Sequence, residues 1–160
     1  MKAQRIEGLE SEMELGAAAR RIVAVRTAEL YAFVPEALDA DAVGVAAMHD
    51  MRIAAKRLRY LLELVGFCFG EIGSEAQGRA RELQDVLGEI HDCDVMLERI
   101  AAIHDRDPDG FAALARRFRA ERAEHVGRFA ALWAEIDRSR LRERLLAHTI
   151  VSPLDASVGP

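Results

Sequence analysis

The chain has 160 residues, of which 51% are hydrophobic and 31% are charged, and its formal net charge is -5. This composition excludes a disordered chain and a lipid-embedded one, and the length suits one domain that buries a core without disulfides or a structural metal. The negative net charge also argues against a protein that coats nucleic acid non-specifically, because such proteins are usually basic.

Three broad parts are expected along the chain. Residues 1–13 are rich in glutamate and have no sustained period, so they predict a flexible acidic leader. Residues 14–150 carry the periodic apolar pattern of a helical domain, and residues 151–160 predict a flexible tail.

The first two helices are bounded by proline and by short acidic residues. Apolar residues recur at helical spacing over residues 15–38, and this helix is expected to end near Pro35. Asp39 and Asp41 offer N-caps for a second helix, which is expected to run to about Phe69.

The next two helices have their own start signals. Ser74 followed by Gln77 is a capping-box pattern and predicts a third helix that begins there and runs to about Ile100. The segment Asp107-Pro108-Asp109-Gly110 predicts a turn, after which the stripe of a fourth helix extends to about Ile136.

A last helix is expected over residues 139–148, and no segment alternates with the period of a strand. Short connections between helices place neighbours antiparallel. The sequence therefore predicts an all-α fold, an antiparallel bundle of about four to five helices.

The second helix separates its side chains into two faces. At about 100° per residue, four basic residues fall within an arc of roughly 80°, opposite an apolar face: His49, Arg52, Lys56 and Arg59. Solvated helices usually mix both charge signs, but here Asp50 is the one acidic residue among these side chains. An anion is the simplest partner, although a merely solvated face or an acidic protein partner would also account for the pattern.

Two linked patterns in the chain resemble a known family. The first is His49-x-x-Arg52-x-x-x-Lys56-Arg57-Leu58-Arg59, and the second is Leu83-Gln84-x-x-Leu87-Gly88-x-x-His91-Asp92-x-Asp94-Val95. Together they resemble the CHAD family, the conserved histidine α-helical domain, over about residues 45–100. That family binds inorganic polyphosphate, so the resemblance implies a non-catalytic polyphosphate-binding module that needs no cofactor.

The charge pattern and the resemblance nominate nine residues for polyphosphate binding. The first group is His49, Arg52, Lys56 and Arg59. The second group is Arg57, Gln84, His91, Arg116 and Arg119. Arg57 lies about 100° from the main arc, so a ligand role and an ion pair with Asp94 or Asp92 are both open. His91 stands where the family often has arginine, which replaces a permanent charge with a titratable one.

An enzyme is the second hypothesis. The pairs His49-Asp50, His91-Asp92 and His104-Asp105 are the residue types that hold ions in metal-dependent phosphohydrolases of the HD type. The neighbouring lysines and arginines would repel a divalent cation, so we assign no catalytic and no metal-binding residues. His125 lies among apolar residues and predicts a hydrogen-bonded core histidine.

A structural or protein-interaction bundle is the third hypothesis. Nucleic acid is disfavoured as a partner, because no aromatic residues interleave with the basic face to stack on bases. Competition would distinguish the remaining hypotheses, since polyphosphate should displace an acidic protein only if both use the face around Arg52.

Cellular location follows from what the sequence lacks. No apolar run approaches the roughly 20 residues that cross a bilayer, and the first residues do not form a signal peptide. We therefore expect a cytoplasmic protein without membrane contact, and the resemblance implies association with polyphosphate granules. Cys68 and Cys93 have no CxxC spacing and predict reduced, buried thiols.

A homodimer is expected from the number of basic patterns. Members of the family resemble a pseudo-two-fold pair of helical bundles, each with a basic helix, whereas the His49 to Arg59 pattern occurs once in this chain. Two facing copies would surround a polyanion, and two-fold symmetry is the commonest way for identical chains to associate. The Cys68/Phe69 end of the second helix and the region of Trp133 are the candidate interfaces.

Overall fold

The computed structural model describes residues 3–34, 45–103 and 108–150. Over these ranges the chain forms helices and contains no strand, which confirms the predicted all-α class. None of the helices in these ranges is both long enough and apolar enough to cross a membrane. The N-caps expected at Asp39 and Asp41, the pair His104-Asp105 and the tail 151–160 lie outside the described residues.

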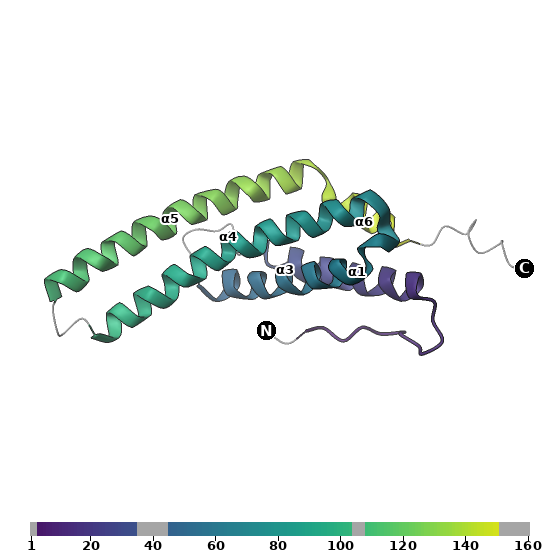
Figure 1. The fold of residues 1–160 in the computed structure, drawn as a ribbon, viewed down its shortest axis with the longest axis horizontal. Helices are drawn as coiled ribbons and strands as arrows, with labels where there is room; N and C mark the ends of the chain where they lie inside the picture. Colours follow the sequence, from purple (N-terminus) through teal and green to yellow (C-terminus); the bar gives the residue numbers. More distant parts are fainter. Residues whose placement is uncertain (1–2, 35–44, 104–107, 151–160) are drawn as a thin grey trace, which may run out of the picture.

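Two long helices dominate the shape of the molecule. The elements follow in the order α1 (Leu15–Ala32), α3 (Val45–Val65), the 3-10 helix η1 (Gly66–Phe69), α4 (Gly70–Ile103), α5 (Pro108–Arg138) and α6 (Leu141–Ala147) (Figure 1). α4 and α5 have 34 and 31 residues and run side by side past the first turn of α3. We call their distal part, residues 95–103 and 108–119, the arm.

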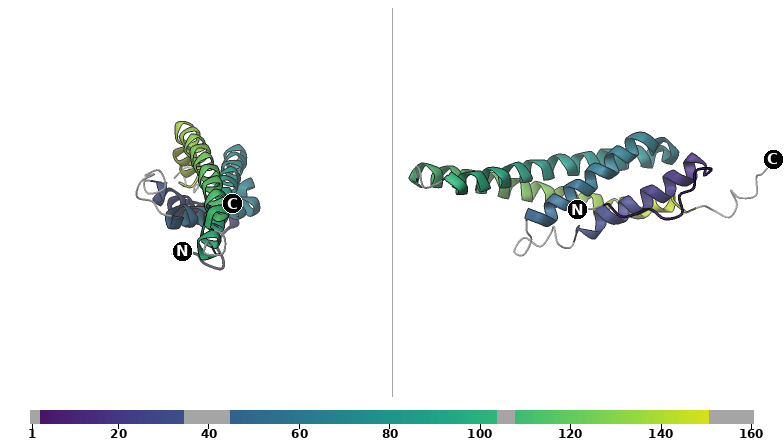
Figure 2. Two further views of the ribbon diagram at one scale, coloured as in Figure 1. Left: turned by 90° about the vertical axis from the view of Figure 1, so that its left-hand side faces the viewer. Right: turned by 90° about the horizontal axis from the view of Figure 1, so that it is seen from below.

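α3 lies between α1 and α4 and contacts both (Figure 2). Its apolar face is buried in a core that also takes side chains from α1, α4, α5 and α6: Met51, Ala54, Ala55, Leu58 and Leu62. Burying one leucine or methionine contributes about 1.5–3 kcal/mol, so this face fixes the rotation of α3 about its axis. The basic face must then point away from the core.

The turn from α3 into α4 differs from its prediction. α4 begins at Gly70, so Ser74 and Gln77 lie inside the helix and the predicted capping box is wrong. Gly70 has φ 59°, which lets the chain turn directly from η1 into α4. A Cβ at Gly73 would collide with the carbonyl oxygen of Gly66, so glycine at this position allows the two segments to touch.

α5 and α6 are separated by Ser139 and Arg140, and Arg140 has the left-handed conformation. Arg140 has φ 52° and ψ 37°, and it is the only non-glycine residue with positive φ in the described ranges. The chain therefore reverses, and α6 contacts α4 and α5. Arg144 donates to both carboxylate oxygens of Glu75 at 2.9 and 2.6 Å, joining α6 to the beginning of α4.

The segment before α1 has no helix but contacts α1 near its end. The backbone N–H of Gln4 donates to the carboxylate of Glu29, and Arg26 donates to the carbonyl oxygen of Gln4 at 3.1 Å. Glu29 is buried and also pairs with Arg26 at 2.6 Å. A buried carboxylate needs such partners, so these contacts anchor the segment to α1.

Candidate functional site

The basic side of α3 lies against α4, and two contacts define the register of this antiparallel pair. The rings of His49 and His91 have centroids 5.0 Å apart. One turn further, Arg52 lies at Gly88, where a Cβ would be 3.7 Å from the Arg52 Nε. A step of three residues forward along α3, from His49 to Arg52, thus corresponds to a step of three residues backward along α4, from His91 to Gly88. Continuing this register turn by turn places Lys56 opposite Gln84 and Arg59 opposite Arg81.

This register predicts that four permanent cations follow one line between the two helices. We call this line the basic seam: Arg52, Lys56 and Arg59 of α3 and Arg81 of α4. Lys56 and Arg81 are exposed, whereas Arg52 and Arg59 are half-buried. Arg81 was not among the residues predicted from the sequence. Its spacing was the available signal, because Arg81, Gln84, Gly88 and His91 share one face of a helix.

Arg52 carries a buried nitrogen that lacks a partner. Its Nε makes no hydrogen bond within the described part of the chain, and the same is true of the Gln84 Oε1. Leaving such a buried group unsatisfied costs about 1–3 kcal/mol, and more when the group is charged. An oxyanion beside Arg52 would satisfy the guanidinium. Rotation of the Gln84 amide would present its NH₂ group as a further donor.

Arg59 and Lys56 both lie near the ring of Tyr60. The guanidinium carbon of Arg59 is 4.4 Å from the ring centroid, and the Lys56 Nζ is 5.8 Å from it. The Arg59 Nε also lies 3.2 Å from Glu63, whose side chain is 40% exposed. Such a solvated pair contributes at most about 1 kcal/mol, so a phosphate group can replace Glu63 at low cost.

The histidine end of the seam opens into a groove of about 420 Å³ between α3 and α4. Its polar lining consists of His49, Asp50, His91, Asp94 and Glu98. Among the described residues, the groove is lined by three carboxylates and by no lysine or arginine, whereas the seam consists of lysine and arginine side chains. The two histidines therefore lie where the positive seam meets a more acidic groove.

Asp94, in the histidine groove, has a partner on α5. The carboxylate of Asp94 is buried and accepts a hydrogen bond from the Arg122 Nε at 2.6 Å. It therefore pairs across to α5, and the roles considered for Arg57 stay predictions. Arg57 is half-buried on α3, and Asp92 is exposed on α4.

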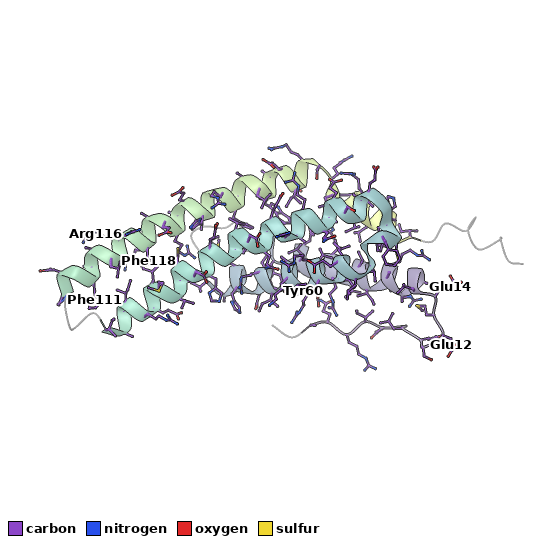
Figure 3. The ribbon with its side chains drawn as sticks, in the orientation of Figure 1. Glu12, Glu14, Tyr60, Phe111, Arg116 and Phe118 are labelled. Atoms are coloured by element: carbon purple, nitrogen blue, oxygen red, sulfur yellow. The ribbon has the colours of Figure 1, made fainter. Side chains whose placement is uncertain are left out.

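Arg116 and Arg119 are not brought together with the seam. Both are exposed on α5, and both line a second groove in the arm with Leu97, Ile100 and Phe111. Figure 3 shows Arg116 in the arm and Tyr60 on α3, well separated along the molecule. The structure thus separates the nine predicted residues into a group at the α3–α4 pair and a pair in the arm.

Potential metal ligands gather elsewhere. Within the described ranges, one group of three such residues is present, and it consists of Cys93, Glu121 and His125. None of them belongs to the His-Asp pairs on which the phosphohydrolase hypothesis rests. His125 is only partly buried, and its ring contacts Glu89 and Arg128, so its surroundings are more polar than the predicted core position.

The fold and the seam define an all-α protein that presents a row of cations along a packed helix pair. A family model, the CHAD domain, matches residues 3–101, which is more than half of the chain. The chain therefore belongs to the CHAD domain family, which is associated with polyphosphate binding. The match contains the whole basic seam. Among curated proteins and solved structures, none is significantly similar to this chain.

Proposed function

We propose that this protein binds inorganic polyphosphate, or a similar polyanion, along the basic seam and catalyses no reaction on it. The observation that carries the proposal is the buried Arg52 Nε, which lacks a hydrogen-bond partner among the described residues. The register of α3 against α4 places three further cations in line with Arg52. Guanidinium groups bind phosphate oxygens in pairs, and lysine adds a compact charge. A flexible polyanion requires such a row of charges and not a closed pocket.

Local charge supports the proposal despite the net charge of -5. Among the described residues, Glu63 forms an ion pair with the seam through Arg59, and the Glu63 side chain is solvent-exposed. The acidic residues of the histidine groove lie at one end, and Asp94 among them is already neutralised by Arg122. The polyanion would therefore lie over Arg52, Lys56, Arg59 and Arg81, with the histidines at its edge.

The phosphohydrolase alternative receives less support from the same geometry. A catalytic metal beside His49 and His91 would lie next to Arg52, whose charge opposes cation binding. A protein-interaction role would use the same seam, because an acidic partner needs the same cations. Displacement of such a partner by polyphosphate would follow directly from binding at the seam.

The first experiment is a titration with long-chain polyphosphate at several salt concentrations. If four to six phosphates are neutralised, counterion release predicts a log–log slope of affinity against salt of about -3 to -5, by analogy with single-stranded nucleic acid. An affinity that is unchanged between low and physiological salt would contradict charge-dominated binding.

A pair of double variants tests the location of the site. We expect Arg52→Glu with Arg59→Glu to abolish binding, because both reversals fall on the seam. Arg116→Glu with Arg119→Glu makes the same charge change in the arm and is expected to retain most of the affinity. Circular dichroism and thermal melting verify that both proteins are folded. Equal affinities of the two double variants would refute the seam as the binding site.

A further inference from the structure

We propose that Cys93 of α4 together with Glu121 and His125 of α5 forms a binding site for a zinc-like divalent cation. This site is independent of polyphosphate binding. Cys93 faces α5, whereas Gly88 and His91 of the same helix face α3. A metal here would join α4 to α5 near the point where the arm leaves the bundle.

The three ligand atoms are already close together. Glu121 and His125 are four residues apart on α5, so their side chains project from the same side of the helix. All three ligand atoms lie within 4.8 Å of one another, and the His125 Nε2 is 4.0 Å from the Glu121 Oε1. With bonds of about 2.0–2.3 Å, tetrahedral zinc holds its ligand atoms roughly 3.3–3.7 Å apart. A side-chain movement of about an ångström would bring the ligand atoms to these distances. The exposed side chain of Glu121 has room for this movement.

A second carboxylate orients the histidine. The His125 Nδ1 lies 3.3 Å from the Glu89 Oε2, while its Nε2 faces Glu121. Metal-binding histidines usually donate their other ring N–H to a carboxylate in this way, which fixes the tautomer. Arg128 lies 3.2 Å from the same Nδ1 and 2.7 Å from Glu89. Once the metal selects the Nδ1–H tautomer, Arg128 retains Glu89 as its partner.

The surroundings of Cys93 disfavour a reactive thiolate when no metal is bound. Burial, followed by the nearby Glu121, raises the pKa of Cys93. A reactive cysteine needs the opposite environment, one that stabilises the thiolate. A bound divalent cation would supply that stabilisation and release the thiol proton to solvent. One thiolate, one carboxylate and one neutral imidazole then balance the two positive charges of the ion.

The ligand types also select the metal. A thiolate and an imidazole favour zinc or cobalt, whereas magnesium and calcium prefer sites made entirely of oxygen ligands. The neighbouring cation, Arg122, is paired with Asp94 at 2.6 Å, so its repulsion of the metal is reduced.

The experiment is a titration of the reduced full-length protein with Co²⁺ in phosphate-free buffer, followed by displacement with Zn²⁺. We expect one equivalent of Co²⁺ to produce the near-ultraviolet charge-transfer absorption of a cobalt–thiolate bond, and Zn²⁺ to remove it. Cys93→Ala should abolish this absorption, whereas Cys68→Ala, which removes the other thiol, should retain it. Absence of the absorption from the unaltered protein, or its persistence in Cys93→Ala, would overturn the proposal.

A second variant tests the site in case Cys93→Ala fails to fold. His125→Gln changes a partly exposed residue and leaves the thiol in place. We expect it to weaken Zn²⁺ binding, measured by competition with a chromophoric chelator, by at least roughly tenfold with unchanged helicity. Unchanged zinc affinity in this variant would also overturn the proposal. Neither measurement depends on polyphosphate, so a failure here leaves the seam untouched.

Discussion

Arg52 of α3 lies directly against Gly88 of α4, where a Cβ would be 3.7 Å from its Nε. Any side chain longer than a methyl group at Gly88 would compete with the guanidinium for this space. The glycine therefore lets an arginine lie flat on the neighbouring helix while its charge remains at the surface. The same register carries the basic seam onward to Arg81.

Neutralising Arg81 should weaken polyphosphate binding. Arg81→Gln removes one cation from the seam, so we expect a roughly tenfold loss of affinity and a salt slope smaller by about 0.7, as for one phosphate contact on a single strand. Arg117→Gln, an exposed arginine on α5, is the matched control. Fluorescence anisotropy with labelled polyphosphate measures both, and equal behaviour would exclude Arg81 from the site.

Binding should strengthen as pH falls through about 7 to 6, where histidine ordinarily takes up a proton. A proton on His49 or His91 adds positive charge beside the polyanion. The groups that face this pair are Arg52 and the carboxylates of the groove, Asp50, Asp94 and Glu98. The double variant His49→Gln with His91→Gln should show a flat profile. If the slope survived, the protons would bind elsewhere.

Two glycines of α4 should respond oppositely to alanine. A Cβ at Gly78 would meet nothing within 4 Å, so Gly78→Ala should stabilise the protein by about 0.5–1 kcal/mol through helix propensity. Gly73→Ala should destabilise it by about 1–3 kcal/mol, because its Cβ would collide with the backbone of Gly66. Urea unfolding measures both, and a stabilising Gly73→Ala would refute the close turn.

Tyr31 should make stability fall at high pH. Burial, followed by the charge of Glu143, raises the pKa of Tyr31 to about 12. Its ring packs edge-on against Trp133, with centroids 5.0 Å apart. Between pH 10 and 12 the unfolded chain has lost the Tyr31 proton and the folded chain retains it. The free energy of unfolding therefore decreases with rising pH, by less than about 1.4 kcal/mol per pH unit because the ring is partly solvated.

The Tyr31→Phe variant isolates that contribution. Without an ionisable hydroxyl, the variant should lose less stability than the unaltered protein between pH 9 and pH 11.5. Urea unfolding at both pH values gives the comparison, in which ionisation of the other side chains cancels. Equal losses in the two proteins would show that Tyr31 ionises alike in the folded and unfolded chains.

The homodimer stays a prediction, and so does its interface, but exposure changes which side chains can form it. Phe69 and Trp133 are buried in the core of the single chain, so neither is available to a partner. The exposed apolar residues nearest to that end are Leu64 and Phe67, each 73% exposed. Light scattering should give about twice the chain mass of 17.7 kDa, and Leu64→Glu with Phe67→Glu should reduce it to one chain. A monodisperse single chain at tens of micromolar would count against the dimer.

The sequence predicted α3 and its two faces well, because charge and hydrophobicity separate cleanly on that helix. Arg81 was harder to assign, since α4 carries acidic and basic residues on several sides and its basic face appears only when α3 is packed against it. The ion pair between Asp94 and Arg122 was hard to predict for the same reason, because it depends on how two helices pack. Arg122 comes from a helix 28 residues away in the chain, and no local pattern connects the two.

Backbone features explain the remaining differences. The capping-box pattern at Ser74 describes a helix that starts from a loop, whereas glycine contacts let α4 start directly after η1. The left-handed Arg140 has no signal in the sequence, because the residue usually found in that conformation is glycine.

The contact between Arg144 and Glu75 has a consequence for the order in which the chain folds. It joins residues 69 apart in the sequence, and such contacts form late because a long loop must first be closed. The basic seam needs only α3 and α4, which are consecutive and joined by a short turn. During synthesis, the seam can therefore assemble as soon as α4 has left the ribosome, while α5 and α6 follow and cover the opposite side of an already formed helix pair.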